Sequence, residues 1–168
     1  DEFFDSLKSD YMNFKKWYEK KARTEKKAYI TRDSNNKIGS FLMLKVEDEN
    51  ESYMDITPMF SPKKRLKIGT FKVISNGFRL GERFIKIIFD NALKNHVQEI
   101  YVTIYDKRPE QRRLIELLEQ WGFTLWGKKN EELVYIRDFS PKYDVKDIKG
   151  CFPYISRERQ AYIVPIYP

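Results

Sequence analysis

Hydrophobic and polar positions follow two different periods in the middle of the chain. Residues 66–74 (LKIGTFKVI) have the composition of a β-strand, and from residue 84 to residue 93 apolar side chains recur every three or four positions, as on one face of an α-helix. Residues 98–105 alternate between apolar and polar types. The pattern predicts a right-handed βαβ unit with two parallel strands.

The turn between this strand and this helix is a candidate anion site. It ends in Arg79-Leu80-Gly81-Glu82-Arg83, directly before the helical pattern begins. The first amides of a helix lack partners inside the helix, and the helix dipole is positive there, so that a phosphate or carboxylate binds with little help from side chains. Ligands of βαβ units also lie at the carboxyl ends of the strands. We therefore place the candidate binding site at this junction.

The residues before the βαβ unit predict one helix and three strands. Asp5 or Ser6 can cap the helix, and its apolar stripe consists of Leu7, Tyr11, Phe14, Trp17 and Tyr18. The opposite face of this helix is rich in lysine. A β-hairpin follows over residues 28–46, with a turn at 33–37, and residues 53–58 predict a third strand.

After the βαβ unit, the pattern predicts another helix and a closing hairpin. Pro109 suits a helix start, and leucines recur from there up to Trp121 on one face. Two further strands are expected at residues 123–126 and 132–137. The expected fold class is α/β, with helices flanking a mixed, largely antiparallel sheet around the central parallel unit.

The composition changes near residue 140. Residues 1–139 contain all the predicted elements, whereas residues 140–168 carry four prolines and aromatic residues without a long period. We expect a domain over 1–139 and, over 140–168, a linker or the start of a further domain, with an arm that packs on its own domain as the alternative. A chain that ends near Phe139 should then fold with near-full stability.

Charge and cysteine content limit the possible partners and the cellular compartment of the protein. The net charge of +7 and the pI of about 9.3 favour anionic partners without naming one. The one cysteine, Cys151, excludes an internal disulfide and any site built from several cysteines, and we predict no metal site. The sequence contains no apolar run long enough to span a bilayer and no signal-peptide pattern, so we expect no membrane partner and a cytoplasmic protein.

Two stretches resemble the GNAT superfamily of acyl-CoA-dependent N-acyltransferases. That family carries (Gln/Arg)-x-x-Gly-x-(Gly/Ala) between its fourth strand and third helix; here Phe78, Gly81 and Arg83 occupy these positions. The stretch from Gln111 to Gly122-Phe123 resembles the family's next helix, with Gln111 in place of an asparagine and Leu118 in place of a tyrosine. The resemblance covers residues 29–139. Family members normally have a strand before the first helix, and this chain starts without one, so it can be a fragment of a longer protein.

The resemblance implies a GNAT-like fold and acetyl-CoA as co-substrate. The residues that it assigns to CoA are Val73, Arg79, Leu80, Gly81, Glu82, Arg83, Phe84 and Gln111. Gly81 removes a Cβ that would stand between backbone and phosphate, or it merely relaxes the turn into the helix.

The resemblance also directs the search for catalytic residues. N-acyl transfer needs a base for the amine, donors for the thioester oxyanion and an acid for the leaving thiolate. Backbone amides near Val73 can supply the donors, because in the family the fourth strand splays at this point. Asp55 is the candidate base, acting through water, and Tyr105 is the candidate acid. A strand-edge charge and an interface aromatic are the alternative readings of these two residues.

Two classes of function follow. The first is an N-acyltransferase that moves an acetyl group from acetyl-CoA to the amine of a small molecule or peptide. The second is a degenerate acyltransferase fold kept as a binding module for RNA or protein, which the basic charge and the altered motifs suit. Nucleic-acid contact is the less favoured reading, and the pattern leaves the oligomeric state open.

Overall fold

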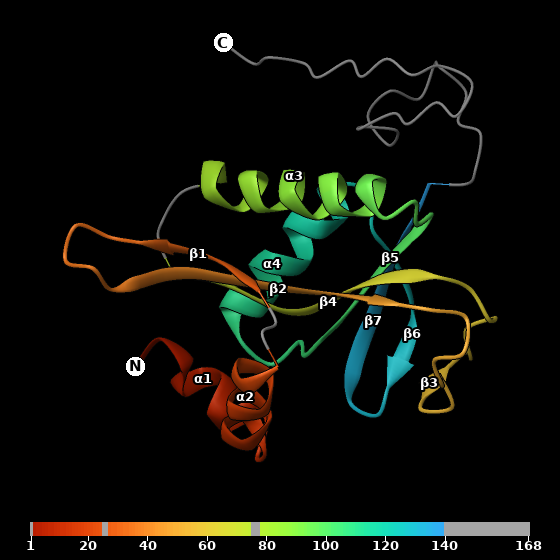
Figure 1. Ribbon diagram of the computed structural model, residues 1–168, viewed down its shortest axis with the longest axis horizontal. Coiled ribbons are helices and arrows are strands. Elements are labelled where there is room, and N and C mark those ends of the chain that lie inside the picture. The colour runs from red at the N-terminus through yellow and green to blue at the C-terminus, as the bar shows by residue number, and fades with distance from the viewer. Residues whose placement is uncertain (1, 25–26, 75–77, 140–168) are drawn as a thin grey trace, which may run out of the picture.

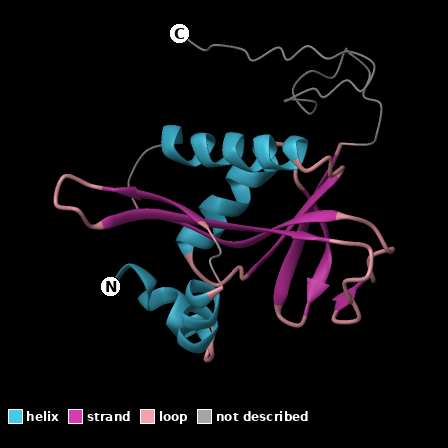
Figure 2. Cartoon of the chain, in the orientation of Figure 1, coloured by secondary structure: helices cyan, strands magenta, loops and turns pink. Residues whose placement is uncertain are grey.

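A computed structural model describes residues 2–24, 27–74 and 78–139 (Figure 1). The predictions for residues 140–168 lie outside the described residues, as does the turn at 75–77. Figure 2 shows a strongly twisted sheet that has helices on both faces.

The described strands form one mixed sheet of seven. Its order is β1-β2-β4-β5-β7-β6-β3, and only β4 and β5 run parallel. The strands are β1 (Ala28–Arg32), β2 (Ile38–Glu47), β3 (Ile56–Thr57), β4 (Arg65–Val73), β5 (Glu99–Ile104), β6 (Thr124–Lys129) and β7 (Glu132–Asp138). This arrangement confirms the predicted fold class, including the central parallel βαβ unit.

Helices α3 (Phe78–Lys94) and α4 (Pro109–Gln120) cover one face of the sheet (Figure 1). The helical spacing in the sequence explains the burial, because Ile85, Ile88 and Ala92 of α3 are completely buried against that face. Phe89 of α3 also stacks on Phe123 beyond α4, with ring centroids 6.3 Å apart. Each fully buried side chain of this size contributes about 1.5–3 kcal/mol, and the largest core cluster of the described residues forms here.

The N-terminal segment covers the opposite face, but as two helices instead of the single one expected. A short 3₁₀ turn, η1 (Glu2–Phe4), leads into α1 (Asp5–Asp10), and α2 (Phe14–Arg23) follows after a break. Phe4, and not Asp5 or Ser6, occupies the N-cap position of α1. The break occurs because Tyr11 is extended, with φ of −126°, and its hydroxyl donates a hydrogen bond to Glu132 on β7.

The third strand is shorter and lies elsewhere than the pattern suggested. β3 contains only two residues and pairs with β6 at the far edge of the sheet, so that Asp55 lies in the turn before it. The surrounding loop still buries Tyr53, Ile56 and Phe60 against Tyr101 of β5. Packing of aromatic side chains therefore holds this segment in place more than strand pairing does.

The basic cluster at the start of β4 is used inside the fold. Arg65 is only 2% exposed, and its Nε lies 2.6 Å from Glu99 of β5. Lys63 also pairs with Glu99, and the Lys64 ammonium donates a hydrogen bond to the carbonyl of Asn95. Lys63, Lys64 and Arg65 therefore already have partners within the fold.

Candidate functional site

The parallel strands β4 and β5 separate part-way along their length. Their pairing runs from Arg65 opposite Glu99 to Ile68 opposite Val102, and beyond this point β4 pairs with β2 alone. Gly69 is an extra residue in β4 at this point, because its neighbours pair with consecutive residues of β2. Such a bulge bends a strand and increases its twist. The bulge therefore opens the sheet directly after the last β4–β5 pair.

Two backbone amides of β4 face this opening. Ile74 donates its N–H to the carbonyl of Gly39 at 2.9 Å, on the β2 side. Hydrogen bonds alternate along an antiparallel pair, so the N–H groups of Phe71 and Val73 point away from β2, toward the side of β5. The geometry thus agrees with the donor role proposed for Val73.

A cavity of about 1350 Å³ lies at the opening. It is larger than the 300–1,000 Å³ that is usual for a small-molecule site, and both layers of helices contribute to its lining. On one side it extends to Val73, Gly81 of α3 and Gln111 of α4, and on the other to Glu47 and Lys67 of the sheet. Its size and position allow two ligands to meet between the strands.

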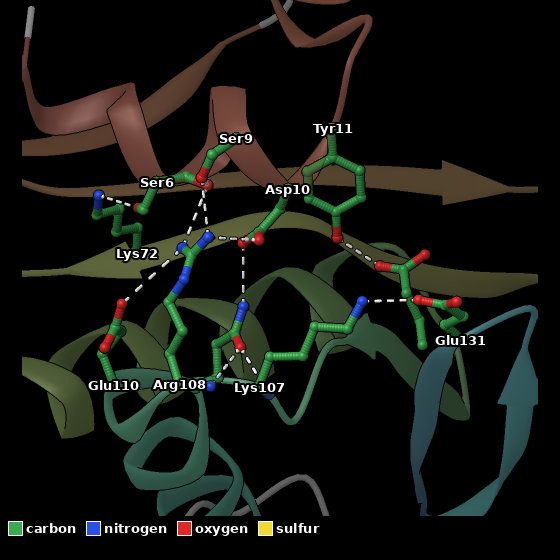
Figure 3. Close-up of polar contacts among 11 residues, drawn as sticks. Ser6, Ser9, Asp10, Tyr11, Lys72, Lys107, Arg108, Glu110 and Glu131 are labelled. Atoms are coloured by element: carbon green, nitrogen blue, oxygen red, sulfur yellow. Dashed lines mark hydrogen bonds and ion pairs between the residues drawn. The ribbon is translucent and has the colours of Figure 1, made fainter.

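Polar contacts join α1 to the loop before α4 along one wall of the cavity (Figure 3). Asp10 lies 2.6 Å from the Arg108 guanidinium and accepts a second hydrogen bond, of 3.1 Å, from the Gln111 amide. Next to it, Tyr11 donates to Glu132. Asp10 is mostly buried, so these charge-assisted contacts are stronger than exposed surface pairs. The wall is therefore a fixed part of the site.

Tyr105 directly follows β5 and lines the cavity. Its ring centroid lies 5.5 Å from that of Tyr11, and the Lys107 ammonium lies 4.5 Å from its ring centre. Burial raises the pKa of Tyr105, and the nearby charge of Glu132 raises this pKa further. Since a free tyrosine already has a pKa of about 10, the phenol carries its proton at neutral pH, as a general acid must.

Asp55 does not line the cavity. Its side chain is half-exposed in the turn before β3, and it forms an ion pair of 2.7 Å with Lys129. The structure therefore does not bring the two predicted catalytic residues, Asp55 and Tyr105, together in the cavity. For Asp55 the interpretation as a surface charge is favoured.

The first two turns of α3 contain the other residues assigned to CoA. Phe84 is buried against Phe71, with ring centroids 5.7 Å apart, so its side chain cannot face a ligand. Leu80 packs against the core, whereas Glu82 and Arg83 are exposed. Because α3 begins at Phe78, the amides of Arg79 and Leu80 lack partners inside the helix, whereas those of Glu82, Arg83 and Phe84 bond to carbonyls one turn back. Only the first turn of α3 therefore offers backbone amides to an anion.

Gly81 lies within α3 rather than in the turn before it. A Cβ built at this position would lie 2.7 Å from Cδ2 of Leu117, on α4. Non-bonded carbon atoms pack at about 3.5–4.0 Å, so the glycine allows α3 and α4 to approach closely. The structure thus gives Gly81 a packing role between helices.

The Gln111 side chain is engaged at both ends. Its Oε1 accepts hydrogen bonds of 3.0 Å from the backbone N–H groups of Lys107 and Arg108, which closes the first turn of α4, and its amide donates to Asp10. These bonds give Gln111 a capping role, as in a capping box. CoA contact stays a prediction for this residue.

Two buried carboxylates of the cavity wall were not found from the sequence. Glu132 begins β7 and Glu47 ends β2, and both line the cavity. Each lies at a strand end next to a loop, where alternation is too short to show which face a side chain takes. Glu47 also begins the acidic run of residues 47–51, a composition typical of an exposed loop, although its own side chain is buried.

Glu47 is held by several donors. Its Oε2 accepts hydrogen bonds from Tyr101 at 2.6 Å and Tyr53 at 3.2 Å, and Lys45 lies 3.0 Å from its Oε1. Burial alone would raise the pKa of Glu47, but the bonds from Tyr101 and Lys45 and the charge of Lys67 outweigh burial and lower it. Glu47 is therefore an anion with most of its acceptor capacity used.

Among known proteins, similarity to this chain is found only in solved three-dimensional structures. No family model and no curated protein matches the chain. The structure is similar to a GNAT-family acetyltransferase from Listeria monocytogenes 4b F2365, at 15% identity and a TM-score of 0.46, over 65% of this chain and 62% of that one. The match thus spans less than two thirds of the Listeria protein.

Two other solved structures are similar at the same level. One is the NatC complex bound to Gag peptide and CoA, with 19% identity and a TM-score of 0.48 over 66% of this chain and 70% of that one. The other is FeeM, an N-acyl amino acid synthase from uncultured soil microbes, with 11% identity and a TM-score of 0.47 over 66% and 71%. At such identities these likenesses concern the fold alone.

Two further searches of the described residues gave negative results. No group of three or more His, Cys, Asp or Glu side chains in residues 2–24, 27–74 and 78–139 is placed to hold a metal ion. Within the same ranges, no helix combines the length and the apolar character that crossing a membrane requires.

Proposed function

We propose that this domain is an N-acyltransferase that moves an acetyl group from acetyl-CoA to the amine of a small molecule or peptide. The observation that carries the proposal is the opening between β4 and β5, where the N–H groups of Phe71 and Val73 face a large cavity. Free amides on one strand, next to a helix N-terminus, suit an extended ligand that ends in phosphates. The single cysteine favours a reducing compartment such as the cytoplasm for this reaction.

Acetyl-CoA, the acetyl donor, would bind with its two ends at different elements of the fold. Its pyrophosphate would accept hydrogen bonds from the free amides in the first turn of α3, those of Arg79 and Leu80, which the helix dipole supports. Its thioester would lie beside β4, where the Val73 amide donates to the carbonyl oxygen and the Phe71 amide faces the same opening. These donors are fixed by the sheet, so they need no reorganisation as negative charge develops on that oxygen.

The transfer needs one base and one acid. The acceptor amine loses a proton to a carboxylate, directly or through water, and its nitrogen bonds to the acetyl carbon. The carbon–sulfur bond then breaks, and the leaving thiolate takes a proton from Tyr105. Glu132 lines the cavity close to Tyr105, whereas Asp55 would have to act through water from outside. We therefore place Glu132 ahead of Asp55 as the base.

The experiment is to incubate the protein with acetyl-CoA and a panel of amines and to detect N-acetylated products by mass spectrometry. For a substrate found in this way, Tyr105→Phe should lower kcat by about 10²-fold, the lower end of the usual effect of a general acid. Tyr135→Phe is the matched control, because this hydroxyl bonds to Glu119 on the opposite face of the sheet. Absence of both product and acetyl-CoA binding would contradict the proposal and favour a binding module.

A further inference from the structure

Two lysines lie directly opposite each other on the face of the sheet that α1 and α2 cover. Lys45 of β2 pairs with Lys67 of β4, and Lys67 in turn pairs with Tyr101 of β5. Like charges directly opposite each other on neighbouring strands destabilise a sheet. Both lysines line the same cavity, so the protein keeps an unfavourable pair at its candidate site.

The two lysines differ in how their charges are matched. Lys45 lies 3.0 Å from Glu47 and 2.8 Å from Glu51. Lys67 has no hydrogen-bond partner among the described residues, and the closest carboxylate oxygen, on Glu47, is 3.9 Å from its Nζ. The Lys67 side chain is only 24% exposed. It therefore presents hydrogen-bond donors to the cavity that lack acceptors of their own.

The neighbouring charged side chains do not provide a hydrogen-bond acceptor for Lys67. Glu47 is already bound by Tyr101, Tyr53 and Lys45. Lys129, which also lines the cavity, is paired with Asp55 at 2.7 Å. Burial lowers the pKa of Lys67, and the charges of Lys129 and Lys45 lower it further, against the opposite effect of Glu47. An anion beside Lys67 would relieve both the burial cost and the repulsion between lysines.

The cavity that Lys67 lines also has apolar side chains. Phe14 and Trp17 of α2 contribute to its lining together with Leu7 of α1 and Met43 of β2. Aromatic and aliphatic side chains of this kind bind the non-polar body of a ligand, while a few polar groups fix its orientation. The cavity thus combines the Lys67 ammonium, which lacks a hydrogen-bond acceptor among the described residues, with apolar side chains.

We propose that the acyl acceptor is a free amino acid with an apolar side chain, whose carboxylate binds Lys67. This inference rests on the proposed function, because it names the substrate of the same site. Lys67 immediately precedes Ile68, after which β4 and β5 separate. An amine next to a carboxylate bound at Lys67 therefore faces the opening where the thioester is placed. The apolar side chain then lies against Phe14, Trp17 and Met43.

The test measures binding without any acyl donor. L-Leucine, L-methionine and L-phenylalanine are each titrated calorimetrically against the wild-type protein, next to the matching amino-acid amide, which keeps the amine and lacks the carboxylate. For at least one pair, the wild type should bind the acid at least about tenfold more tightly than the amide, which corresponds to about 1.4 kcal/mol. Lys67→Met should remove this preference, whereas Lys67→Arg should retain part of it.

Lys86→Met is the matched control, since this exposed lysine of α3 pairs with Asp90 outside the cavity. It loses the same charge and should keep the full preference for acids. The melting temperature of Lys67→Met should change little, because the variant loses both the repulsion from Lys45 and the attraction to Glu47. Equal binding of acids and amides by the wild type, no binding of any acid, or a preference that persists in Lys67→Met would overturn the inference.

A parallel assay with acetyl-CoA separates the two proposals. Acetylation of amines without any dependence on a carboxylate would contradict the role of Lys67 and leave the acyltransferase proposal standing. Binding of apolar amino acids through Lys67 without acetyl transfer would support the Lys67 site and contradict the proposed function.

Discussion

Gly81→Ala tests the close packing of α3 on α4. Within a helix, alanine is favoured over glycine by about 1 kcal/mol. The new methyl group would, however, lie 2.7 Å from Cδ2 of Leu117, well inside van der Waals contact. Adding a methyl group to a packed core typically costs about 1–3 kcal/mol. We therefore expect Gly81→Ala to reduce the free energy of unfolding by up to about 2 kcal/mol, the difference of these two effects.

A double-mutant cycle with Leu117→Ala isolates the contact. Leu117→Ala removes the obstructing atoms, so Gly81→Ala in that background should become neutral or stabilising, with a coupling energy of about 1–3 kcal/mol between the two sites. Urea denaturation of the four proteins measures this. Additive effects, or a full 1 kcal/mol of stabilisation from Gly81→Ala alone, would refute the packing argument. Because the methyl group points at Leu117, acetyl-CoA affinity should change by less than about tenfold.

Three further predictions concern other parts of the fold. Glu99→Ala should lower the free energy of unfolding by about 3–5 kcal/mol, because it leaves the Arg65 guanidinium buried without its carboxylate; thermal denaturation checks this, and a change below about 1 kcal/mol would contradict it. Gly127→Ala should displace β3, since the new Cβ would lie 2.1 Å from the Thr57 carbonyl oxygen; an unchanged NMR spectrum around β3 would be the opposing result. Glu47 has a lowered pKa in the folded protein, so it contributes stability that is present above its unfolded pKa of about 4.5 and is lost as pH falls. Glu47→Gln should flatten this acid limb, and an equally steep limb in the variant would contradict the argument.

The sequence predicts most of the helices and strands because a regular spacing of apolar residues that extends over many positions is easy to recognise. The ten residues 84–93 show three turns of one helical face, and α3 buries that face. The parallel pairing of β4 and β5 followed from the helix between them. The break between α1 and α2 was missed for a physical reason: the local spacing from Leu7 to Tyr18 is helical throughout, and only the distant contact of Tyr11 with Glu132 interrupts it.

The site was harder to predict than the fold. Val73 was predicted from the family resemblance, in which the fourth strand splays at this point, and Tyr105 from its place at the carboxyl end of the fifth strand; both line the cavity. Asp55 was selected because its segment was expected to form a longer strand, whereas aromatic packing and a two-residue pairing shape that loop. In the sequence, Lys67 is one cation of a basic run over residues 63–67, and only the structure separates it from Lys63, Lys64 and Arg65, which have partners within the fold. Its significance depends on Lys45, which lies across the sheet and 22 residues earlier in the sequence.

The most direct measurement of the acyltransferase account is calorimetric titration of acetyl-CoA into the wild type, Val73→Ala and Val73→Pro. The alanine variant keeps the N–H that faces the opening, whereas proline removes it and leaves the β2 ladder intact, since that N–H points away from β2. We predict binding by the wild type, similar binding by Val73→Ala and a dissociation constant about tenfold higher for Val73→Pro, as expected when a buried carbonyl loses its donor. No binding by the wild-type protein, or equal affinity of a folded Val73→Pro variant, would contradict the account.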